Sequence, residues 1–149
     1  MSEIEGLSQL NATLKKLERD AGKFSKGAYI AGGKLVESDA KKSIQSKSGG
    51  EVVTRYRNGG GSYNHTVSSP NDAPNTDTGR LVSSINTELT NDAVFVGTSL
   101  EYGKFLEFGT KNMTERPWLI PALAKNEQTI IDLQINAINK SIRNNEQNV

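Results

Sequence analysis

Hydrophobic residues recur at intervals of three and four positions near the start of the chain, from Ile4 to Leu17. This spacing predicts an amphipathic helix with one apolar face. Two glycines beyond Asp20 weaken a helix, so we expect it to end there and a second helix to run to about Ser46. The second helix is rich in small residues, including Gly32-Gly33, which would let another backbone approach closely.

The composition changes over residues 47–77, where Gly, Ser, Asn, Thr and Pro dominate. Residues 51–57 and 62–67 predict two short strands, joined by the turn Asn58-Gly59-Gly60-Gly61. Glycines there supply the positive φ angles that a hairpin turn needs. Because a lone two-stranded hairpin is only marginally stable, we expect a flexible arm that a partner orders by covering it.

A second hairpin is predicted after a short helix that Thr78 would cap. Residues alternate in polarity on both sides of Asn91-Asp92, which is typical of a two-residue turn. That turn sets a register in which the apolar partners share one face. The expected pairs are Leu89 with Val94, Thr87 with Val96 and Ile85 with Thr98.

A short helix should follow, because Thr98-Ser99-Leu100-Glu101 has the spacing of a capping box. We expect its inward face to be Tyr102, Phe105 and Leu106, and its end to be Gly109.

The last predicted helix has Pro121 in its first turn and a broad apolar stripe, and the chain is polar from Arg143 on. The stripe consists of Leu123, Ile130, Ile131, Ile135, Ile138 and Ile142. The element order predicts an α+β fold, with a small antiparallel sheet packed against two N-terminal helices and a long C-terminal helix, and an extended hairpin arm. We expect one domain over residues 1–143, with the arm at about 47–77 and a disordered tail at 144–149.

Composition excludes several classes of protein. The chain has 149 residues, no cysteine, one histidine and a net charge of +1, from 18 basic and 17 acidic residues. A general nucleic-acid coat normally has a clear basic excess, and thiol catalysis and thiolate metal sites need cysteine. No apolar run reaches the length of a membrane span, and the N-terminus does not resemble a signal peptide. We therefore expect a soluble protein of a reducing compartment.

No constellation of residues suggests catalysis. The glycine-rich turn lacks the Gly-Lys-Ser/Thr ending of a phosphate-binding loop. His65, the one candidate general base, lies in the arm, where we expect an exposed side chain. Glu101 and Glu107 would point in different directions on one helix, so we expect solvated or inter-subunit roles for them. We predict no catalytic residue, no metal site and no cofactor.

Two groups of residues are candidates for binding a partner. Arg55 and Arg57 share one face of a predicted strand, which is either a solvated face, a protein-binding surface or a contact for DNA phosphates. The aromatic cluster between Tyr102 and Trp118 belongs either to the core or to a subunit interface. The candidate interface residues are Arg55, Tyr56, Arg57, Tyr63, Glu107, Phe108, Arg116 and Trp118.

A succession of motifs extends over about residues 78–125. It reads Thr78-Gly79-Arg80-Leu81-x-x-Ser84-Ile85, Val94-x-Val96-Gly97-Thr98, Tyr102-Gly103-Lys104-Phe105-Leu106-Glu107-Phe108-Gly109-Thr110, and Met113-x-x-Arg116-Pro117-Trp118-Leu119-x-Pro121-Ala122. This succession resembles the tail-component family of long-tailed bacteriophages, also called tail-completion or head–tail joining (neck) proteins.

The resemblance implies a structural virion protein without catalysis, assembled in the cytoplasm of a host bacterium. It implies a homo-oligomeric ring between head and tail, with a head connector or stopper and a tail terminator or tail tube as neighbours. Genome DNA would pass through the ring without sequence-specific binding, and a balanced charge suits such a channel because a strongly basic one would retain DNA. A tail terminator or connector adaptor of the same particle, a small DNA-binding protein and an enzyme such as a hydrolase or toxin are the alternatives.

Overall fold

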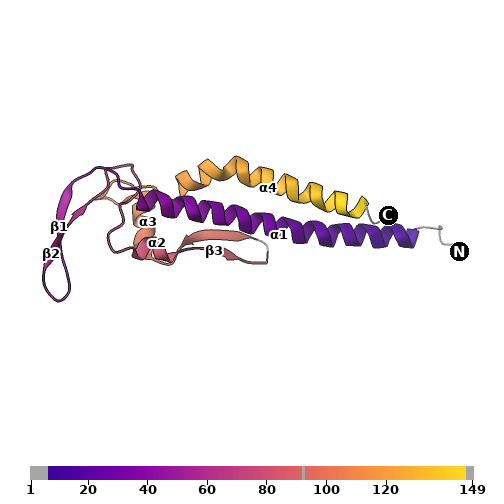
Figure 1. Ribbon diagram of the computed structural model, residues 1–149, viewed down its shortest axis with the longest axis horizontal. Coiled ribbons are helices and arrows are strands. Elements are labelled where there is room, and N and C mark those ends of the chain that lie inside the picture. The colour runs from indigo at the N-terminus through magenta and orange to yellow at the C-terminus, as the bar shows by residue number, and fades with distance from the viewer. Residues whose placement is uncertain (1–6, 92, 147–149) are drawn as a thin grey trace. The chain divides into compact units, whose positions relative to one another are not determined.

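The computed structural model describes residues 7–91 and 93–146 (Figure 1). The elements are α1 (Leu7–Gln45), β1 (Val52–Tyr56), β2 (Ser62–Thr66), α2 (Arg80–Ser84), β3 (Ile85–Leu89), β4 (Val94–Thr98), α3 (Glu101–Phe108) and α4 (Ile120–Glu146). The predicted α+β fold is confirmed. Contacts divide the chain into a helical unit, Met1–Gly32 with Glu127–Val149, and a sheet unit, Gly33–Asn126. The single-domain organisation stays a prediction.

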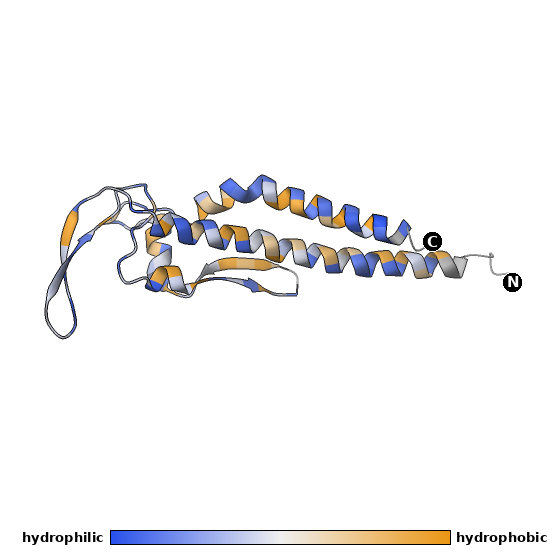
Figure 2. Cartoon of the chain, viewed as in Figure 1, coloured by the Kyte–Doolittle hydropathy of each residue, from blue (hydrophilic) through white to orange (hydrophobic). Residues whose placement is uncertain are grey.

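In the helical unit, the first part of α1 runs antiparallel to the second part of α4 (Figure 1). The Ser25 hydroxyl donates to Gln134 Oε1 at 3.2 Å. At Gly32 the helices approach so closely that a Cβ atom would lie 3.0 Å from Ile130 Cγ1. Hydrophobic and hydrophilic residues recur in bands along both helices (Figure 2), as expected for helices with an apolar face.

The N-terminal part of the chain differs from the sequence prediction. The two N-terminal helices that we expected are one continuous helix, α1. Gly22 and Gly27 have no atom within 4 Å of where a Cβ would be, so they lie on the open side of the helix. Each costs about 1 kcal/mol relative to alanine, and packing of the opposite side offsets that cost. Ile4, the first residue of the predicted stripe, lies outside the described residues.

In the sheet unit, β3 and β4 pair in the predicted register. Leu89 lies opposite Val94, Thr87 opposite Val96 and Ile85 opposite Thr98. The hairpin packs on α1 at Gly33, where a Cβ would lie 2.7 Å from both Thr87 Cγ2 and Val94 Cγ1. Asp92, the second residue of the predicted turn, lies outside the described residues.

Two carboxylates of α1 form hydrogen bonds with other elements of the sheet unit, one with β3 and one with the start of α4. Glu37 accepts the Thr87 hydroxyl at 2.6 Å and binds the ammonium groups of Lys34 and Lys41. Asp39 accepts the Asn126 side-chain amide at 2.9 Å, and the ammonium group of Lys125 lies 3.0 Å away. Both donors belong to the first part of α4, so their bonds attach it to α1. The same bonds lower the pKa of Asp39 because they stabilise its ionised form.

The predicted hairpin of the arm is confirmed. Its two strands pair from Val52↔Thr66 to Tyr56↔Ser62, and the three turn glycines have φ values of 113°, 98° and 87°. Asn75 joins the two ends of the arm: its amide accepts the Ser48 N–H and donates to the Ser48 and Thr66 carbonyls, each at 2.9 Å. The flexibility of the arm stays a prediction.

The predicted caps of the two short helices are wrong. The N-cap of α2 is Gly79, with φ 76°, instead of Thr78. The N-cap of α3 is Leu100, with no side-chain capping bond, so the predicted capping box is not formed. The Thr98 hydroxyl accepts the N–H of Leu100 at 3.1 Å and lies 2.6 Å from the Ser84 hydroxyl. Thr98 therefore bonds ahead of α3 and not within its first turn.

The buried residues of α3 and α4 are small or polar, and not the large apolar residues that we expected. On α3, Tyr102 and Phe105 are exposed while Gly103 and Glu107 are buried. On α4 the buried residues are Ala122, Asn126 and Ser141, whereas most of the predicted stripe is partly exposed. Glu107 and Asn126 are buried because they form hydrogen bonds with neighbouring segments, and the larger apolar side chains lie on other faces of these helices. Helix α4 continues to Glu146, beyond the expected start of the polar tail, and residues 147–149 lie outside the described residues.

Candidate functional site

The corner between α3 and α4 is organised by a buried carboxylate. Glu107 Oε2 accepts the backbone N–H groups of Trp118 and Leu119 at 2.8 and 2.9 Å. Its Oε1 accepts the N–H of Ile120, the first residue of α4, at 2.8 Å. The first N–H groups of a helix have no partner within it, and a negative charge there is favoured by the helix dipole. Glu107 therefore caps α4.

This capping role corrects the expectation of a solvated Glu107, because only 5% of the residue is exposed. Trp118 is 2% exposed, and its indole N–H donates to the carbonyl of Gly103 at 3.1 Å. A Cβ at Gly103 would lie 3.6 Å from the indole and 2.5 Å from Thr98 Cγ2. Glu107 and Trp118 thus belong to the interior of the sheet unit, where they fix the start of α4.

Arg116 connects this corner to the part of the arm that follows β2. Its guanidinium donates to the carbonyl of Ser68 and, at 2.6 Å, to the Ser68 hydroxyl. Its backbone N–H donates to Leu106 at 2.7 Å, and the carbonyl of Glu115 accepts the N–H of Asn71 at 3.0 Å. Ser68 is buried, so Arg116 satisfies polar atoms that would otherwise be unpaired.

The carboxylate of Asp77 contacts three polar side chains on one face of the arm. The Tyr63 hydroxyl donates to Asp77 Oδ1 at 2.7 Å, the Nε atom of Arg55 lies 3.7 Å from Oδ2, and His65 Nδ1 lies 3.8 Å from Oδ1. The bond to Asp77 raises the pKa of Tyr63 because it stabilises the protonated phenol. The expectation of an exposed His65 is wrong: only 12% of its side chain is exposed, because it faces Asp77.

The predicted interface residues therefore fall into three groups. Arg55, Arg57 and Tyr63 meet in the arm, where the Arg57 guanidinium lies 5.3 Å from the centre of the Tyr63 ring. Glu107, Trp118 and Arg116 form the interior corner described above. Tyr56 and Phe108 remain the accessible aromatic residues of the set, at 83% and 64% exposure.

Sequence reasoning missed Asn75 and Asp77, which hold the base of the arm. Both follow Pro74 in a stretch that resembled an ordinary loop. Asn and Asp side chains commonly bond to nearby backbone in turns, so residue type alone could not reveal contacts with strands nine or more positions away.

The described residues contain neither a metal-binding cluster nor a membrane-spanning helix. Within residues 7–91 and 93–146, no group of three or more His, Cys, Asp or Glu side chains could hold a metal ion. Among the helices of the same residues, none combines the length and the apolar character that crossing a membrane requires.

Comparison with known proteins identifies the family. The family model described as "Bacteriophage HK97-gp10, putative tail-component" matches residues 8–109, which is more than half of the chain. The match includes most of α1, the arm, both hairpins and α3. No curated protein and no solved structure matches the chain significantly. The chain therefore belongs to the HK97-gp10-like family of bacteriophage tail components.

Proposed function

We propose that this phage tail component is a structural subunit of the neck, which joins the head connector to the tail and forms a ring around the DNA channel. The protein makes no covalent change in a substrate; it acts through surfaces that fit its neighbours. Those neighbours are other copies of the chain, a head connector or stopper, and a tail terminator or tail tube. The site of action is the virion, after assembly in the host cytoplasm.

The observation that supports this role is the hairpin arm. Strands β1 and β2 form a sheet of two strands, so within the described residues each strand has one edge without a neighbouring strand. Such edges pair readily with a strand of another chain. Val52 and Tyr56 are 60% and 83% exposed, and they offer apolar contacts beside those edges.

The base of the arm favours a defined contact surface. Asn75 joins both ends of the hairpin, and Asp77 binds Tyr63 and Arg55 on its face. These bonds reduce the number of conformations that a partner must select, which lowers the entropic cost of association. The arm is therefore the surface that we assign to head–tail joining.

Charge supports a passage for DNA without tight binding. The net charge is +1, and Asp77 lies close to Arg55 while the ring of Tyr63 lies under Arg57. Partners inside the chain thus compete with DNA phosphates for these two cations.

The test shortens the arm in the parent phage. Residues 53–65 are replaced by Asn-Gly, which keeps the Thr66 and Ser68 contacts with Asn75 and Arg116. The matched control replaces only the turn, residues 58–61, and keeps both strands. We expect the shortened chain to fold but to leave heads and tails unjoined in electron micrographs, while the control joins them. Infectious particles with the shortened arm would contradict the proposal.

Binding assays assign the neighbours. Purified chain should bind both tail tubes and DNA-filled heads. Binding to tail tubes alone would indicate a tail terminator, and binding to heads alone a connector adaptor. A salt-dependent affinity for duplex DNA that falls in the Arg55→Ala/Arg57→Ala variant would instead favour a DNA-binding protein.

A further inference from the structure

The tip of the arm, residues 58–61, contains an asparagine that is followed directly by glycine. Asn58-Gly59 is the single Asn-Gly pair of the sequence. Asparagine is a chemically labile residue, because the backbone nitrogen of the next residue can attack its side-chain amide. A glycine hinders this attack least, since it has no side chain.

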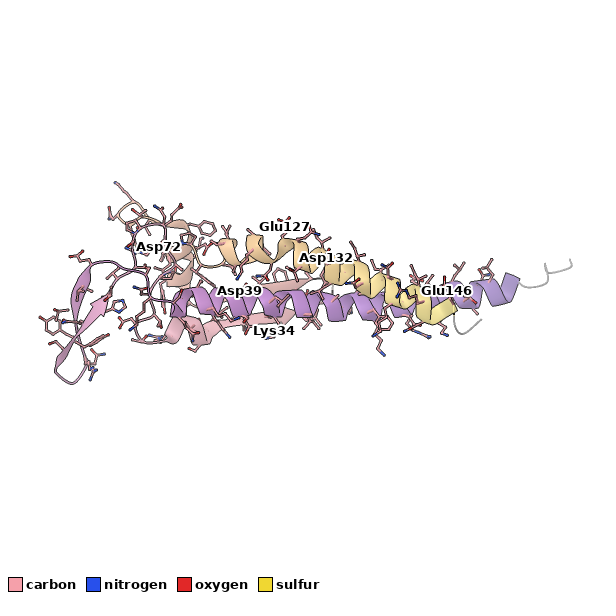
Figure 3. All side chains as sticks on the ribbon, turned by 45° about the horizontal axis from the view of Figure 1, so that its top comes forward. Lys34, Asp39, Asp72, Glu127, Asp132 and Glu146 are labelled. Carbon is pink, nitrogen blue, oxygen red and sulfur yellow. The ribbon has the colours of Figure 1, made fainter. Side chains whose placement is uncertain are left out.

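The surroundings of the tip leave this asparagine open to water. Asn58 and all three glycines of the tip are exposed. Figure 3 shows this end of the hairpin well apart from Asp39 and Asp72, the labelled acidic residues of the same unit. A Cβ atom on any of the three glycines would have no other atom within 4 Å. The side-chain amide of Asn58 therefore has both access to water and room to rotate.

The hydrogen bonds of the turn do not involve the two groups that would react. The N–H of Gly60 donates to the carbonyl of Arg57 at 3.1 Å, and the N–H of Arg57 donates to the carbonyl of Gly61 at 3.0 Å. Within residues 7–91 and 93–146, neither the amide of Asn58 nor the N–H of Gly59 has a hydrogen-bond partner. The attacking nitrogen and the carbon that it attacks are therefore both free of competing bonds.

Other asparagines of the arm lack this combination of features. Asn75 is held by the bonds to Ser48 and Thr66 at the base of the arm. Asn64 lies in β2, opposite Thr54, and is followed by His65 in place of a glycine. Pairing in a strand and bonding to the backbone both oppose the rotation that ring closure requires.

We propose that Asn58 is a modification site, at which asparagine is converted to aspartate or isoaspartate with water as the second reactant. The nitrogen of Gly59 bonds to Cγ of Asn58, and its proton passes to the departing amide, which leaves as ammonia. Water then opens the five-membered ring that has formed. Cleavage of the new bond to Cγ gives aspartate, and cleavage of the original peptide bond gives isoaspartate, in which the main chain runs through Cγ.

Either product changes the charge of the tip. One new carboxylate lowers the net charge of the chain from +1 to 0, since the acidic residues rise from 17 to 18. The carboxylate lies next to Arg57, whose guanidinium is 5.3 Å from the centre of the Tyr63 ring. Isoaspartate also adds one carbon to the main chain between Arg57 and Gly60, the two residues that the turn's hydrogen bond joins.

The first test incubates the full chain at neutral pH for several days and then analyses its tryptic peptides by mass spectrometry. Trypsin cuts after Arg57 and Arg80, so the peptide 58–80 contains Asn58 together with Asn64 and Asn75 as internal references. We expect the replacement of NH₂ by OH at Asn58 to be at least about 10-fold faster than at either reference. A sample digested without incubation gives the background. An unmodified Asn58, or equal rates at the three asparagines, would overturn the proposal.

A second test identifies the attacking nitrogen. Gly59→Ala adds a methyl group beside the reacting bond and should slow the modification at least about 10-fold. Gly61→Ala is the matched control, because Gly61 also has a positive φ and open surroundings but lies two residues further along. The control should react at nearly the natural rate. No slowing in Gly59→Ala, or equal slowing in both variants, would contradict attack by the nitrogen of Gly59.

The ratio of the products tests the ring intermediate. Opening of the ring from both sides gives a mixture of aspartate and isoaspartate, which electron-transfer fragmentation of the peptide distinguishes. Aspartate alone would indicate direct hydrolysis of the side chain and would overturn the ring route. These measurements use the free chain and need no phage assembly, so the proposal does not rest on the head–tail joining role.

Discussion

Trp118 donates two hydrogen bonds to α3, and one of them is accepted by the carboxylate of Glu107. The carboxylate of Glu107 accepts the backbone N–H of Trp118 at 2.8 Å, and the indole of Trp118 donates to Gly103, on the helix that bears Glu107, at 3.1 Å. Both residues are buried. The carboxylate of Glu107 therefore accepts N–H groups at the start of α4, and the indole of Trp118 donates to α3.

Glu107→Gln tests the capping role. The amide keeps one oxygen but replaces the other by an NH₂ group, which cannot accept the N–H bonds that Glu107 receives. We expect a loss of about 2–3 kcal/mol in the free energy of unfolding, because a buried helix end loses charge-assisted bonds. Urea denaturation measures it. Glu101→Gln, at an exposed position of α3, is the control and should change stability by less than about 0.5 kcal/mol.

Trp118→Ala should destabilise the chain by about 3–5 kcal/mol, because the indole is 2% exposed and its removal leaves a cavity. Phe108→Ala removes an aromatic ring that is 64% exposed and should have a much smaller effect. Thermal unfolding compares the two variants. Equal effects would show that the indole does not contribute to the core.

Two glycines of α1 should respond to alanine with opposite signs. Gly33→Ala would bring a methyl group to 2.7 Å from Thr87 and Val94, so we expect about 1–3 kcal/mol of destabilisation. Gly27→Ala meets no atom within 4 Å and should stabilise the helix by about 0.5–1 kcal/mol. Denaturation midpoints of the two variants check both signs. A stabilising Gly33→Ala would contradict the packing of the β3–β4 hairpin on α1.

Stability should depend on pH through Glu37. Bonds from Lys34, Lys41 and Thr87 lower the pKa of Glu37 from 4.5 to about 2. Between these values the unfolded chain binds more protons than the folded chain, so this contribution is present above pH 4.5 and is lost as the pH falls towards 2. We expect Glu37→Gln to cost about 1 kcal/mol at pH 7, after allowance for solvent screening, and less below pH 4.5.

Unfolding of the natural chain and the variant at several pH values measures this difference. Glu18→Gln, at an exposed position earlier in α1, is the matched control. A cost for Glu37→Gln that is the same at pH 7 and pH 3 would show that the charge of Glu37 is not what binds Thr87.

The two hairpins show what the sequence alone could predict. Alternating polarity and turn chemistry are local signals, and they fixed both strand pairs, including Leu89 opposite Val94. The glycines at 59–61 are also a local signal, because their positive φ angles suit a hairpin turn, and they predicted the hairpin of the arm. Register needs no knowledge of distant segments.

The α3–α4 corner shows what could not be predicted. Glu107 has the spacing of a polar surface residue, and its burial depends on N–H groups that are 11 to 13 positions further along the chain. The apolar positions of the short helix predict Tyr102 and Phe105 on its inward face, yet Gly103 is buried against Trp118 instead. A contact between distant segments decided both cases, and local propensity does not contain that information.

The capping of α4 by Glu107 has a consequence for related phage chains. The matched family region ends at residue 109, so it contains the acceptor but not the three donors at 118–120. A relative with an acidic residue at this point of the helix must supply free backbone N–H groups from a later segment, because an ionised carboxylate enclosed without donors is strongly unfavourable. Where the acid is replaced by an apolar residue, the later helix should begin with its own Ser, Thr, Asp or Asn.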